Sequence, residues 1–316
     1  MEVHFGVVQG GTLGPIMFSL FMNDLASHVK FGKVTSYADD SQILHSSKPD
    51  SIDELRHVIE TDLKEISSWF SGNGLKVNAA KTNCMIAGTP RSTDRAASLT
   101  VQFDDVQLHH SNKIKIIGVT IDQHLNFESQ TGEVAQRCNR TIASIRKLNF
   151  PKDISQKVIQ ALVFPFVTYC LPAWAPSTQK QRKRIQKVLN FAVRTATGLR
   201  KYDHVSQSRR DLGWMSFEEM IAMRDAQRIH FIMWNDESSQ QIKSLIETRA
   251  QVSERQTRST VDESVLQIPR CRLQTTKMMF PHRAVMTWNG LPRNLRRGSM
   301  AALKKKATAW LGGNVK

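Results

Sequence analysis

The stretch Ser36-Tyr37-Ala38-Asp39-Asp40-Ser41 decides how the first part of the chain folds. It lies between two short β-prone runs, residues 33–37 and 42–45, which can pair as a hairpin with Asp39 and Asp40 at the tip. An Asp-Asp pair is most often only a turn, because Asp side chains bond their own backbone. Two adjacent carboxylates are also the hard oxygen ligands that Mg²⁺ needs in two-metal phosphoryl-transfer sites. The neighbouring sequence decides between these interpretations.

A glycine-rich segment, residues 9–15, precedes this stretch and follows a β-prone run at residues 3–8. Adjacent glycines permit a backbone that side chains would obstruct, and Pro15 suits the first turn of a helix. We expect that helix over residues 16–29, before Gly32. A strand, turn and helix of this kind can place backbone N–H groups against a phosphate or a base, although the spacing of a P-loop is absent. The apolar face of the expected helix consists of Met17, Leu20, Phe21 and Leu25.

The rest of the first part alternates between helix and strand signals. Ser51 and Glu54 fit a capping box before a helix over residues 52–70, whose apolar stripe indicates core packing. A second pair, Asp104-Asp105, has no glycine-rich loop beside it and serves as an internal control that predicts a plain turn. These signals predict an α+β fold in which an antiparallel sheet is packed by helices. The expected strands are residues 75–77, 82–87, 99–103, 106–108 and 113–121.

Charge is distributed unevenly along the 316 residues. The net charge is +16, of which residues 1–121 contribute −2 and residues 122–316 contribute +18. A domain with excess cationic charge is suited to bind a polyanion, because neutralising phosphates releases condensed counterions. A basic face that only keeps the protein in solution is the alternative.

The basic second part has helical periodicity. We expect helices over residues 129–148, 155–169 with a kink near Pro165, 179–197 ending at Gly198, and 217–234 behind a capping box of Ser216 and Glu219. Residues 236–275 are expected to form a connection with a weak helix at 240–250. A turn-rich element at 281–297 and a basic helix at 299–311 are expected to follow it. The helix at 179–197 can contact a duplex backbone or remain a solvated surface. Its basic residues are Lys180, Arg182, Lys183, Arg184 and Lys187.

Several classes of protein are disfavoured by the sequence. The N-terminal residues lack a signal peptide, and no apolar run is long enough for a membrane span, so a nuclear or cytoplasmic protein is the default. The cysteines have no zinc-ligand spacing and are expected to be reduced and mostly buried. These cysteines are Cys84, Cys138, Cys170 and Cys271.

Taken in order, the motifs resemble those of reverse transcriptases of non-LTR (LINE-type, jockey-like) retrotransposons. Residues 9–18 and the Asn23-Asp24-Leu25 after them resemble the family's P-Q-G-S-x-L-G-P-x-L-F and its following Asn-Asp-Leu. Tyr37-Ala38-Asp39-Asp40 is similar to the Y/F-A-D-D polymerase tip. Three further stretches match later parts of the family, so the likeness spans nearly the whole chain. They are residues 75–82, residues 117–122 (family L-G-V-x-x-D) and Trp288-Asn289-Gly290-Leu291-Pro292.

The resemblance implies a partial reverse-transcriptase palm at 1–121, a basic, mainly helical thumb at 122–235, and a connection with a C-terminal element at 236–316. It implies Mg²⁺, or Mn²⁺ in its place, with an RNA template, a DNA primer and dNTP as partners. Asp39 and Asp40 would bind metal and act in catalysis with Lys81, which matches a lysine thought to aid pyrophosphate departure. The implied nucleotide and template contacts are Gln9, Gly10, Gly11, Leu13, Gly14 and Tyr37, the primer grip is Gly118 and Val119, and the duplex contacts are the five basic residues of 179–197.

The chain also departs from the family pattern. Val8 stands where the family has Pro, and Gly11 where it has Ser. The family's first metal-binding aspartate and its fingers lie upstream of the Gln-Gly loop, and no Asp is present before Gln9. We therefore expect a C-terminal fragment of the polymerase that is inactive on its own. A non-catalytic nucleic-acid-binding module that uses the basic helices, and a translated relic without a selected role, are the alternatives.

Overall fold

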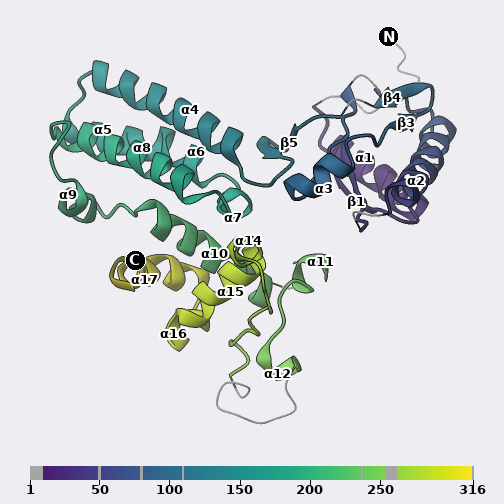
Figure 1. Cartoon of the computed structure of the whole chain (residues 1–316). Coiled ribbons are helices and arrows are strands. Elements are labelled where there is room, and N and C mark those ends of the chain that lie inside the picture. The colour runs from purple at the N-terminus through teal and green to yellow at the C-terminus, as the bar shows by residue number, and fades with distance from the viewer. Residues whose placement is uncertain are drawn as a thin grey trace. The chain divides into compact units, whose positions relative to one another are not determined.

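The computed structural model describes residues 10–48, 51–78, 81–108, 110–235, 238, 240–252 and 262–314. The chain divides into two compact units, Met1–Ile114 and Lys115–Lys316, so the division follows Ile114, whereas the sequence analysis places a boundary after residue 121. Helices and small antiparallel sheets are combined, in agreement with the expected α+β class (Figure 1). The expected strand at 3–8 lies outside the described residues.

The first unit is arranged around one long helix, α2 (Ile52–Gly72). The C-terminal half of α2 packs Ile66 and Trp69 against Met22 and Leu25, and its N-terminal half packs Leu55 and its apolar neighbours against a second small cluster. The other elements of this unit are α1 (Gly14–Met22), the 3₁₀ helix η1 (Asn23–His28), the hairpin β1 (Lys33–Tyr37) and β2 (Asp40–Leu44), α3 (Pro90–Arg95), and the hairpin β3 (Val101–Phe103) and β4 (Val106–Leu108).

The second unit begins with a helical layer. Strand β5 (Lys113–Ile116), which spans the division, pairs with β6 (Val119–Asp122) and leads into α4 (Glu128–Lys147). Helix α4 packs along α8 (Gln179–Thr197), and α5 (Lys152–Leu162) packs on both. The shorter α6 (Phe164–Thr168), α7 (Leu171–Trp174) and α9 (Ser206–Asp211) complete this layer.

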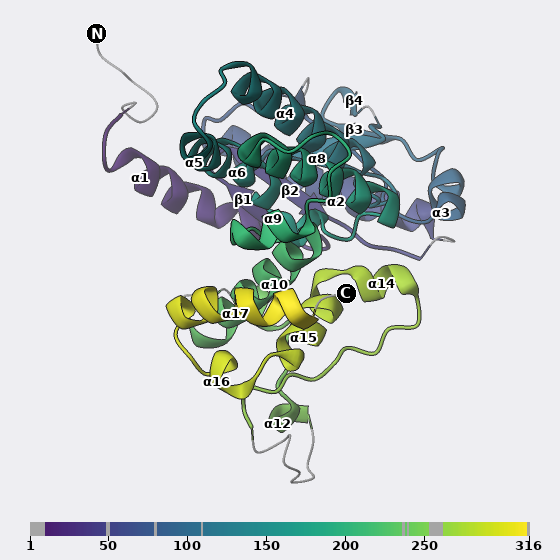
Figure 2. The same ribbon diagram turned by 90° about the vertical axis from the view of Figure 1, so that its left-hand side faces the viewer.

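Helix α10 (Phe217–Trp234) joins the two cores of the second unit. Its first turns, with Phe217 and Met220, belong to the core of the α4–α8 layer, whereas Ala226 and Ile229 belong to the core under the C-terminal helices. Figures 1 and 2 both show α10 between these two layers. The C-terminal layer contains α11 (Gln240–Lys243), α12 (Arg249–Val252), α14 (Gln274–Met278), α15 (Phe280–Gly290), α16 (Arg293–Arg296) and α17 (Met300–Asn314).

Several sequence predictions about the first unit were wrong in detail. The single helix expected over 16–29 is divided into α1 and η1, and of its expected apolar face only Leu25 is buried, while Met17, Leu20 and Phe21 are exposed. Ser51 accepts no capping hydrogen bond through its side chain. Residues 75–77 form no strand, and 82–87 contribute only a bridge between Cys84 and His110. Val77, Cys84 and Ile86 instead pack against the core cluster that contains Val101 and Phe103, so their apolar pattern reflects burial rather than a strand.

Two long elements are interrupted where the backbone changes direction. The strand expected over 113–121 is the β5–β6 hairpin, because Ile117 and Gly118 have φ of 43° and 78°. The kinked helix expected over 155–169 is two helices, α5 and α6, with Pro165 in the first turn of α6. The four cysteines are free, as expected, but only Cys138 is buried, and burial raises its pKa to about 11.

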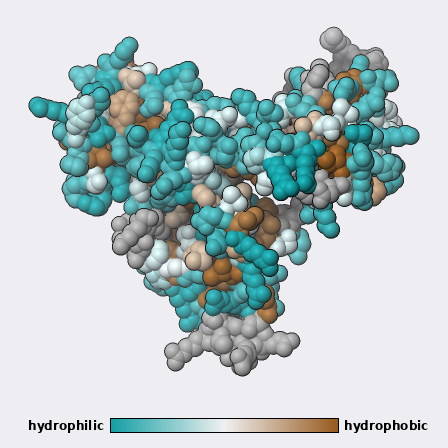
Figure 3. Space-filling view, viewed as in Figure 1, coloured by the Kyte–Doolittle hydropathy of each residue, from teal (hydrophilic) through white to brown (hydrophobic). Residues whose placement is uncertain are grey.

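The surface is mostly hydrophilic, with apolar breaks. Brown, apolar residues interrupt the teal surface in the space-filling view of Figure 3. In the first unit the exposed apolar side chains include Leu13, Ile16 and Leu20 around α1. No helix among the described ranges has both the length and the apolar character needed to cross a membrane.

Candidate functional site

The β1–β2 hairpin presents Asp39 and Asp40 as the sequence predicts. Tyr37 pairs with Asp40, so Ala38 and Asp39 form a two-residue turn in which Ala38 has a φ of 52°. Tyr37 and Asp40 are direct cross-strand partners, which places their side chains on the same face of the hairpin. Both carboxylates are exposed at the tip. The tip can therefore offer two oxygen ligands to a cation from solvent.

The second hairpin provides a control for this geometry. Phe103 pairs with Val106 across a two-residue turn, and Asp104 has a φ of 50°. The backbone of the two turns is thus alike. The strands that carry Asp104 and Asp105, however, place Val101 and Phe103 in a buried core cluster. An exposed Asp-Asp turn is therefore not itself a site. What distinguishes Asp39 and Asp40 is the set of residues that surround and hold their hairpin.

The base of the β1–β2 hairpin is held by Asp62 of α2. Its fully buried carboxylate accepts hydrogen bonds from the backbone N–H groups of Lys30 and Gly32, both at 2.8 Å, and from Phe31 at 3.2 Å. The Nε2 atom of His45 lies 2.8 Å from Asp62 Oδ2. One carboxylate therefore joins the chain entering β1 to the chain leaving β2.

The charge of Asp62 and the absence of a side chain at Gly32 both contribute to this anchor. Burial disfavours the ionised form, but the hydrogen bonds from Lys30, His45 and Gly32 outweigh it and hold the pKa of Asp62 below its ordinary value. A Cβ atom at Gly32 would lie 2.6 Å from Ile43 Cγ2 and 2.8 Å from His45 Nε2. Residue 32 must therefore be glycine for the His45 ring to reach Asp62.

Sequence reasoning missed this anchor. The available signal was Asp62 itself, which lies three and seven residues after Ile59 and Leu55 in the apolar stripe of α2. A carboxylate on the core-facing side of a helix needs hydrogen-bond partners, which predicts a polar network at that level of the helix.

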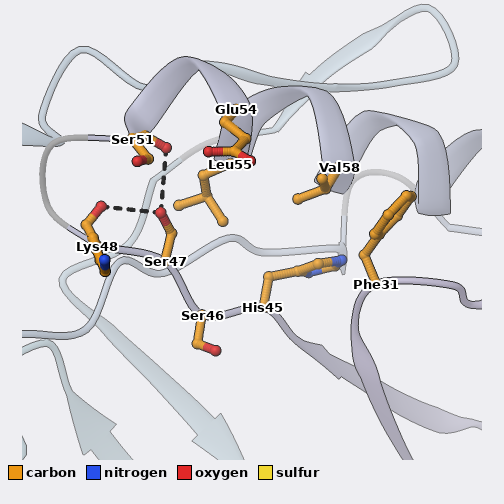
Figure 4. Close-up of a pocket in the computed structure, with 9 residues that line it drawn as sticks. All are labelled: Phe31, His45, Ser46, Ser47, Lys48, Ser51, Glu54, Leu55 and Val58. Atoms are coloured by element: carbon orange, nitrogen blue, oxygen red, sulfur yellow. Dashed lines mark hydrogen bonds between the residues drawn. The ribbon is translucent and has the colours of Figure 1, made fainter.

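A cavity of about 410 Å³ lies beside this anchor (Figure 4). Phe31 and His45 line one side and Glu54, Leu55 and Val58 of α2 line the other. Its mouth carries a serine-rich segment in which Ser47 Oγ donates hydrogen bonds to the carbonyl groups of Lys48 and Ser51. Neither Asp39 nor Asp40 lines it, so this cavity is separate from the hairpin tip.

The other residues expected around the nucleotide lie on the surface of the first unit. Gly10 has a φ of 83°, and a Cβ atom placed there would have no described atom within 4 Å. Gly11 and Leu13 are exposed, and Gly14 is the first residue of α1. Helix α1 shares a core cluster with the hairpin through Phe18 and Ile43. Lys81 is exposed, and no described contact joins its ammonium group to Asp39 or Asp40. Gln9 lies outside the described residues.

The hairpin tip fits a magnesium ion in part. No group of three or more His, Cys, Asp or Glu side chains gathers anywhere in the described ranges, so Asp39 and Asp40 have no third protein ligand there. Mg²⁺ retains several waters and is usually held by one or two carboxylates together with substrate phosphates. Two exposed, adjacent carboxylates satisfy that requirement.

The expected primer grip belongs to the second unit and forms the β5–β6 turn. Gly118 faces the ring of Tyr169, and a Cβ atom at Gly118 would lie 3.5 Å from Tyr169 Cε1. The Tyr169 hydroxyl donates a hydrogen bond of 2.8 Å to the carbonyl oxygen of Ile117. Val119 is buried in the core of the α4–α8 layer, so only its backbone can contact a ligand. The turn is thereby fixed on the helical layer.

Four of the five basic residues expected to contact a duplex form an exposed face on α8. Lys180, Lys183, Arg184 and Lys187 are exposed, and we refer to them as the α8 basic face. Arg182 differs, and its assignment as a duplex contact needs correction. Its guanidinium donates to Glu218 Oε2 at 2.8 Å and to the carbonyl of Ala175 at 2.7 Å, with only 17% of the side chain exposed. Arg182 therefore ties α8 to the start of α10.

Comparison with known proteins agrees with the motifs. Residues 2–121 match the family model described as "Reverse transcriptase (RNA-dependent DNA polymerase)". The chain is 27% identical over 231 residues to the probable RNA-directed DNA polymerase from transposon BS of Drosophila melanogaster, which covers 69% of this chain and 25% of that relative. The polymerases of the mobile element jockey and the transposon X-element, from the same organism, are 22% and 23% identical over 66% and 67% of this chain, which are 23% and 24% of those relatives. No solved structure matches.

These matches agree with a reverse transcriptase domain at residues 2–121. Over a longer stretch the chain is similar to the RNA-directed DNA polymerases of LINE-type, non-LTR retrotransposons. The resemblance found in the motifs is confirmed. The chain spans about a quarter of the length of the curated relatives it matches.

Proposed function

We propose that this chain takes part in RNA-templated DNA synthesis, in which a primer 3′-hydroxyl attacks the α-phosphate of a dNTP and pyrophosphate leaves. The observation that carries the proposal is the exposed Asp39–Asp40 tip on a hairpin whose base is fixed by Asp62. A rigidly held pair of carboxylates is suited to position charge with little reorganisation during the reaction.

In this proposal Asp39 and Asp40 are the residues that would hold Mg²⁺. The ion, when bound, supplies electrostatic stabilisation of the charge that develops on the transferring phosphoryl group. The exposed backbone of Gly10 and Gly11 contacts the nucleotide or the template, and Lys81 donates a proton to the departing pyrophosphate or stabilises its charge. Tyr37 stands beside Asp40 on the hairpin and packs against the primer terminus or the incoming sugar.

Metal binding at the hairpin tests this assignment without requiring turnover. Electron paramagnetic resonance of Mn²⁺ with the full chain, a primer–template duplex and dNTP should show bound ion that is lost in Asp39→Ala. Asp105→Ala removes the same charge from the control hairpin and should leave the signal unchanged. Primer extension that the chain performs, and that Asp39→Ala lowers on the order of a thousandfold relative to Asp105→Ala, would overturn the expectation that the chain alone is inactive. Equal metal binding in the two variants would contradict the proposal.

The structure also favours a second candidate, in which the chain binds nucleic acid without catalysis. The specific observation is the α8 basic face, four cations that all remain exposed while Arg182 is held inside. Such a face suits the phosphate backbone of a duplex, which it would position without reading sequence.

Salt dependence of duplex binding tests this second candidate. Replacing Lys180, Lys183 and Lys187 by Gln in the full chain should reduce the slope of log K against log salt by about 2 to 3, since each neutralised phosphate of a duplex contributes about 0.9. Replacing three exposed lysines of the first unit, Lys64, Lys76 and Lys113, makes the same charge change and should alter the slope much less. Equal effects of the two triple variants would remove the α8 basic face from the proposal.

A further inference from the structure

Three arginines converge on one carboxylate in the C-terminal layer. Arg293, Arg296 and Arg297, spaced three and one residues apart, lie on one face of α16 and its end. Their guanidinium nitrogens approach Asp262 at 3.3 Å for Arg293 Nε, 3.4 Å for Arg296 Nη2 and 3.2 Å for Arg297 Nη2. Three positive charges face one negative charge. We refer to these three residues as the arginine cluster.

The single carboxylate of Asp262 does not neutralise the three guanidinium groups of the cluster. Its Oδ1 atom already accepts hydrogen bonds from Ser264, at 2.6 Å from the hydroxyl and 3.1 Å from the backbone N–H. The contacts with the arginines are all longer than the 2.7–2.9 Å usual for an N–H donor that carries charge to a carboxylate. Glu263, the other acid of this segment, is exposed and forms none of the ion pairs described. Among the residues that the structure describes, the cluster therefore has an excess of positive charge.

Arg296 is the member for which this excess is most costly. The residue is 8% exposed, and in the described part of the chain its Nε atom has no hydrogen-bond partner and its Nη1 atom lies 3.4 Å from the carbonyl oxygen of Ser264. Burial lowers its pKa, Asp262 opposes that change, and Arg293 and Arg297 add to it. A buried guanidinium with an open donor is stabilised by an anion.

The backbone under the cluster is fixed, while two of its side chains reach solvent. Trp234 of α10 donates a hydrogen bond of 3.0 Å to the carbonyl of Arg296, and His230 Nε2 lies 2.7 Å from the carbonyl oxygen of Gly298. Arg293 and Arg297 keep 62% and 43% of their side-chain surface exposed. Because the contacts of Trp234 and His230 hold the loop through its backbone carbonyl groups, the two exposed arginine side chains are available to an external ligand.

We propose that Arg293, Arg296 and Arg297 form a binding site for a phosphate group, supplied by a polynucleotide backbone or by a free small molecule. Guanidinium groups donate paired hydrogen bonds to phosphate oxygens, and three of them around one point match the oxygens of a single phosphate. Figures 1 and 2 show α16, which carries Arg293 and Arg296, in the C-terminal layer on one side of α10, and α8 in the helical layer on the other side. The proposed site depends neither on the α8 basic face nor on Asp39 and Asp40.

Chemical protection of the arginines tests the site directly. The full chain is treated with phenylglyoxal, which modifies exposed arginines, and labelling is read by mass spectrometry with inorganic phosphate, dNTP or an oligonucleotide present, and with chloride at equal ionic strength. Arg293 and Arg297 should be protected severalfold, while the exposed Arg270 and Arg272 should not be. Protection by the oligonucleotide alone identifies a backbone phosphate, and protection by inorganic phosphate or dNTP identifies a free one. Equal labelling in all conditions overturns the proposal.

Paired substitutions give a second, independent measurement. Arg293→Gln with Arg297→Gln leaves the buried Arg296 intact, and Arg270→Gln with Arg272→Gln makes the same charge change outside the cluster. For an oligonucleotide ligand the first pair should lower the salt slope by about 1.4 to 1.8, since each phosphate contributes about 0.7 to 0.9. For a free phosphate it should abolish the rise in melting temperature that phosphate causes. Identical behaviour of the two pairs contradicts the site, whatever the result at Asp39.

Discussion

At Asp62 four donors meet one carboxylate, and each belongs to the chain just outside the hairpin that carries Asp39 and Asp40. The side chain is fully buried, so its loss cannot be compensated by water from bulk solvent. The arrangement joins a single helix position to both strands of the hairpin. Asp62 is therefore a positioning residue for the tip, although it lies far from it along the chain.

Replacement of Asp62 by Ala should destabilise the first unit by about 1–3 kcal/mol, because the backbone N–H groups of Lys30 and Gly32 lose their acceptor. Asp62→Asn keeps one acceptor oxygen and should cost less. Urea denaturation measures the change. Glu65→Gln on the same helix is the matched control, since Glu65 forms only an exposed pair with Lys30 and should change stability little. An effect of Asp62→Ala no larger than that of Glu65→Gln would contradict the role given to the anchor.

The same carboxylate predicts the acid dependence of stability. Because the folded pKa of Asp62 lies below its ordinary value of 3.8, ionised Asp62 stabilises the fold above that pH. The contribution is lost as the pH falls through the folded pKa. The difference in stability between the native chain and Asp62→Asn should therefore shrink between about pH 5 and pH 3. A difference in stability that stays constant over this pH range would show that the charge of Asp62 does not contribute to the stability of the fold.

At the scale of elements, local signals predicted the helix ends and distant contacts decided the rest. Helices α8 and α10 begin and end where the sequence analysis places them. Gly198, with a φ of 78°, ends α8, and the Ser216–Glu219 capping box starts α10. Each of these signals acts within a few residues of the helix end and so can be read from sequence.

Elements whose ends depend on a distant partner were not predictable in this way. The apolar residues of 82–87 have the composition of a strand but pack against the core cluster of residues 99–108, with only the bridge between Cys84 and His110. Arg182 has the spacing of a surface cation, yet Glu218, 36 residues away, holds it inside. The Asp39–Asp40 hairpin could be predicted because a turn is local, whereas its anchor could not, because Asp62 lies 30 residues beyond Gly32.

The buried helix α10 shows the limit of periodicity at this scale. Its buried residues occupy every side of the helix, including Phe217, Met220, Ala222 and Met223, because one core lies on each side of it. The sequence of α10 is not apolar all round, since it includes Glu219, Asp225 and His230, so its periodicity does not reveal that both sides are buried. The C-terminal layer was expected as a connection, a turn-rich element and a basic helix at 299–311, and of these the last corresponds to α17.

At the scale of the whole molecule, the hydrophobic cores follow the division of the chain. The two clusters of the first unit each contain four buried residues, all before residue 109. The two clusters of the second unit are larger and share α10, and all their buried residues lie after residue 118. No described core cluster crosses from one unit to the other. Cooperative unfolding requires a shared core, so the two units should unfold separately.

Urea should therefore unfold the chain in two transitions, the first unit at the lower concentration because its cores are smaller. Leu25→Ala, at a site 1% exposed, should lower only the first midpoint, and Ile159→Ala, at a site with no exposure, should lower only the second. Each substitution should reduce the free energy of unfolding of its own unit by about 2–5 kcal/mol. Trp69 is the single tryptophan of residues 1–114, so loss of its fluorescence change in Trp69→Phe assigns the first transition. One transition that both core substitutions shift together would show that the units share their stability, and the α8 basic face and the hairpin could then no longer be treated as independent.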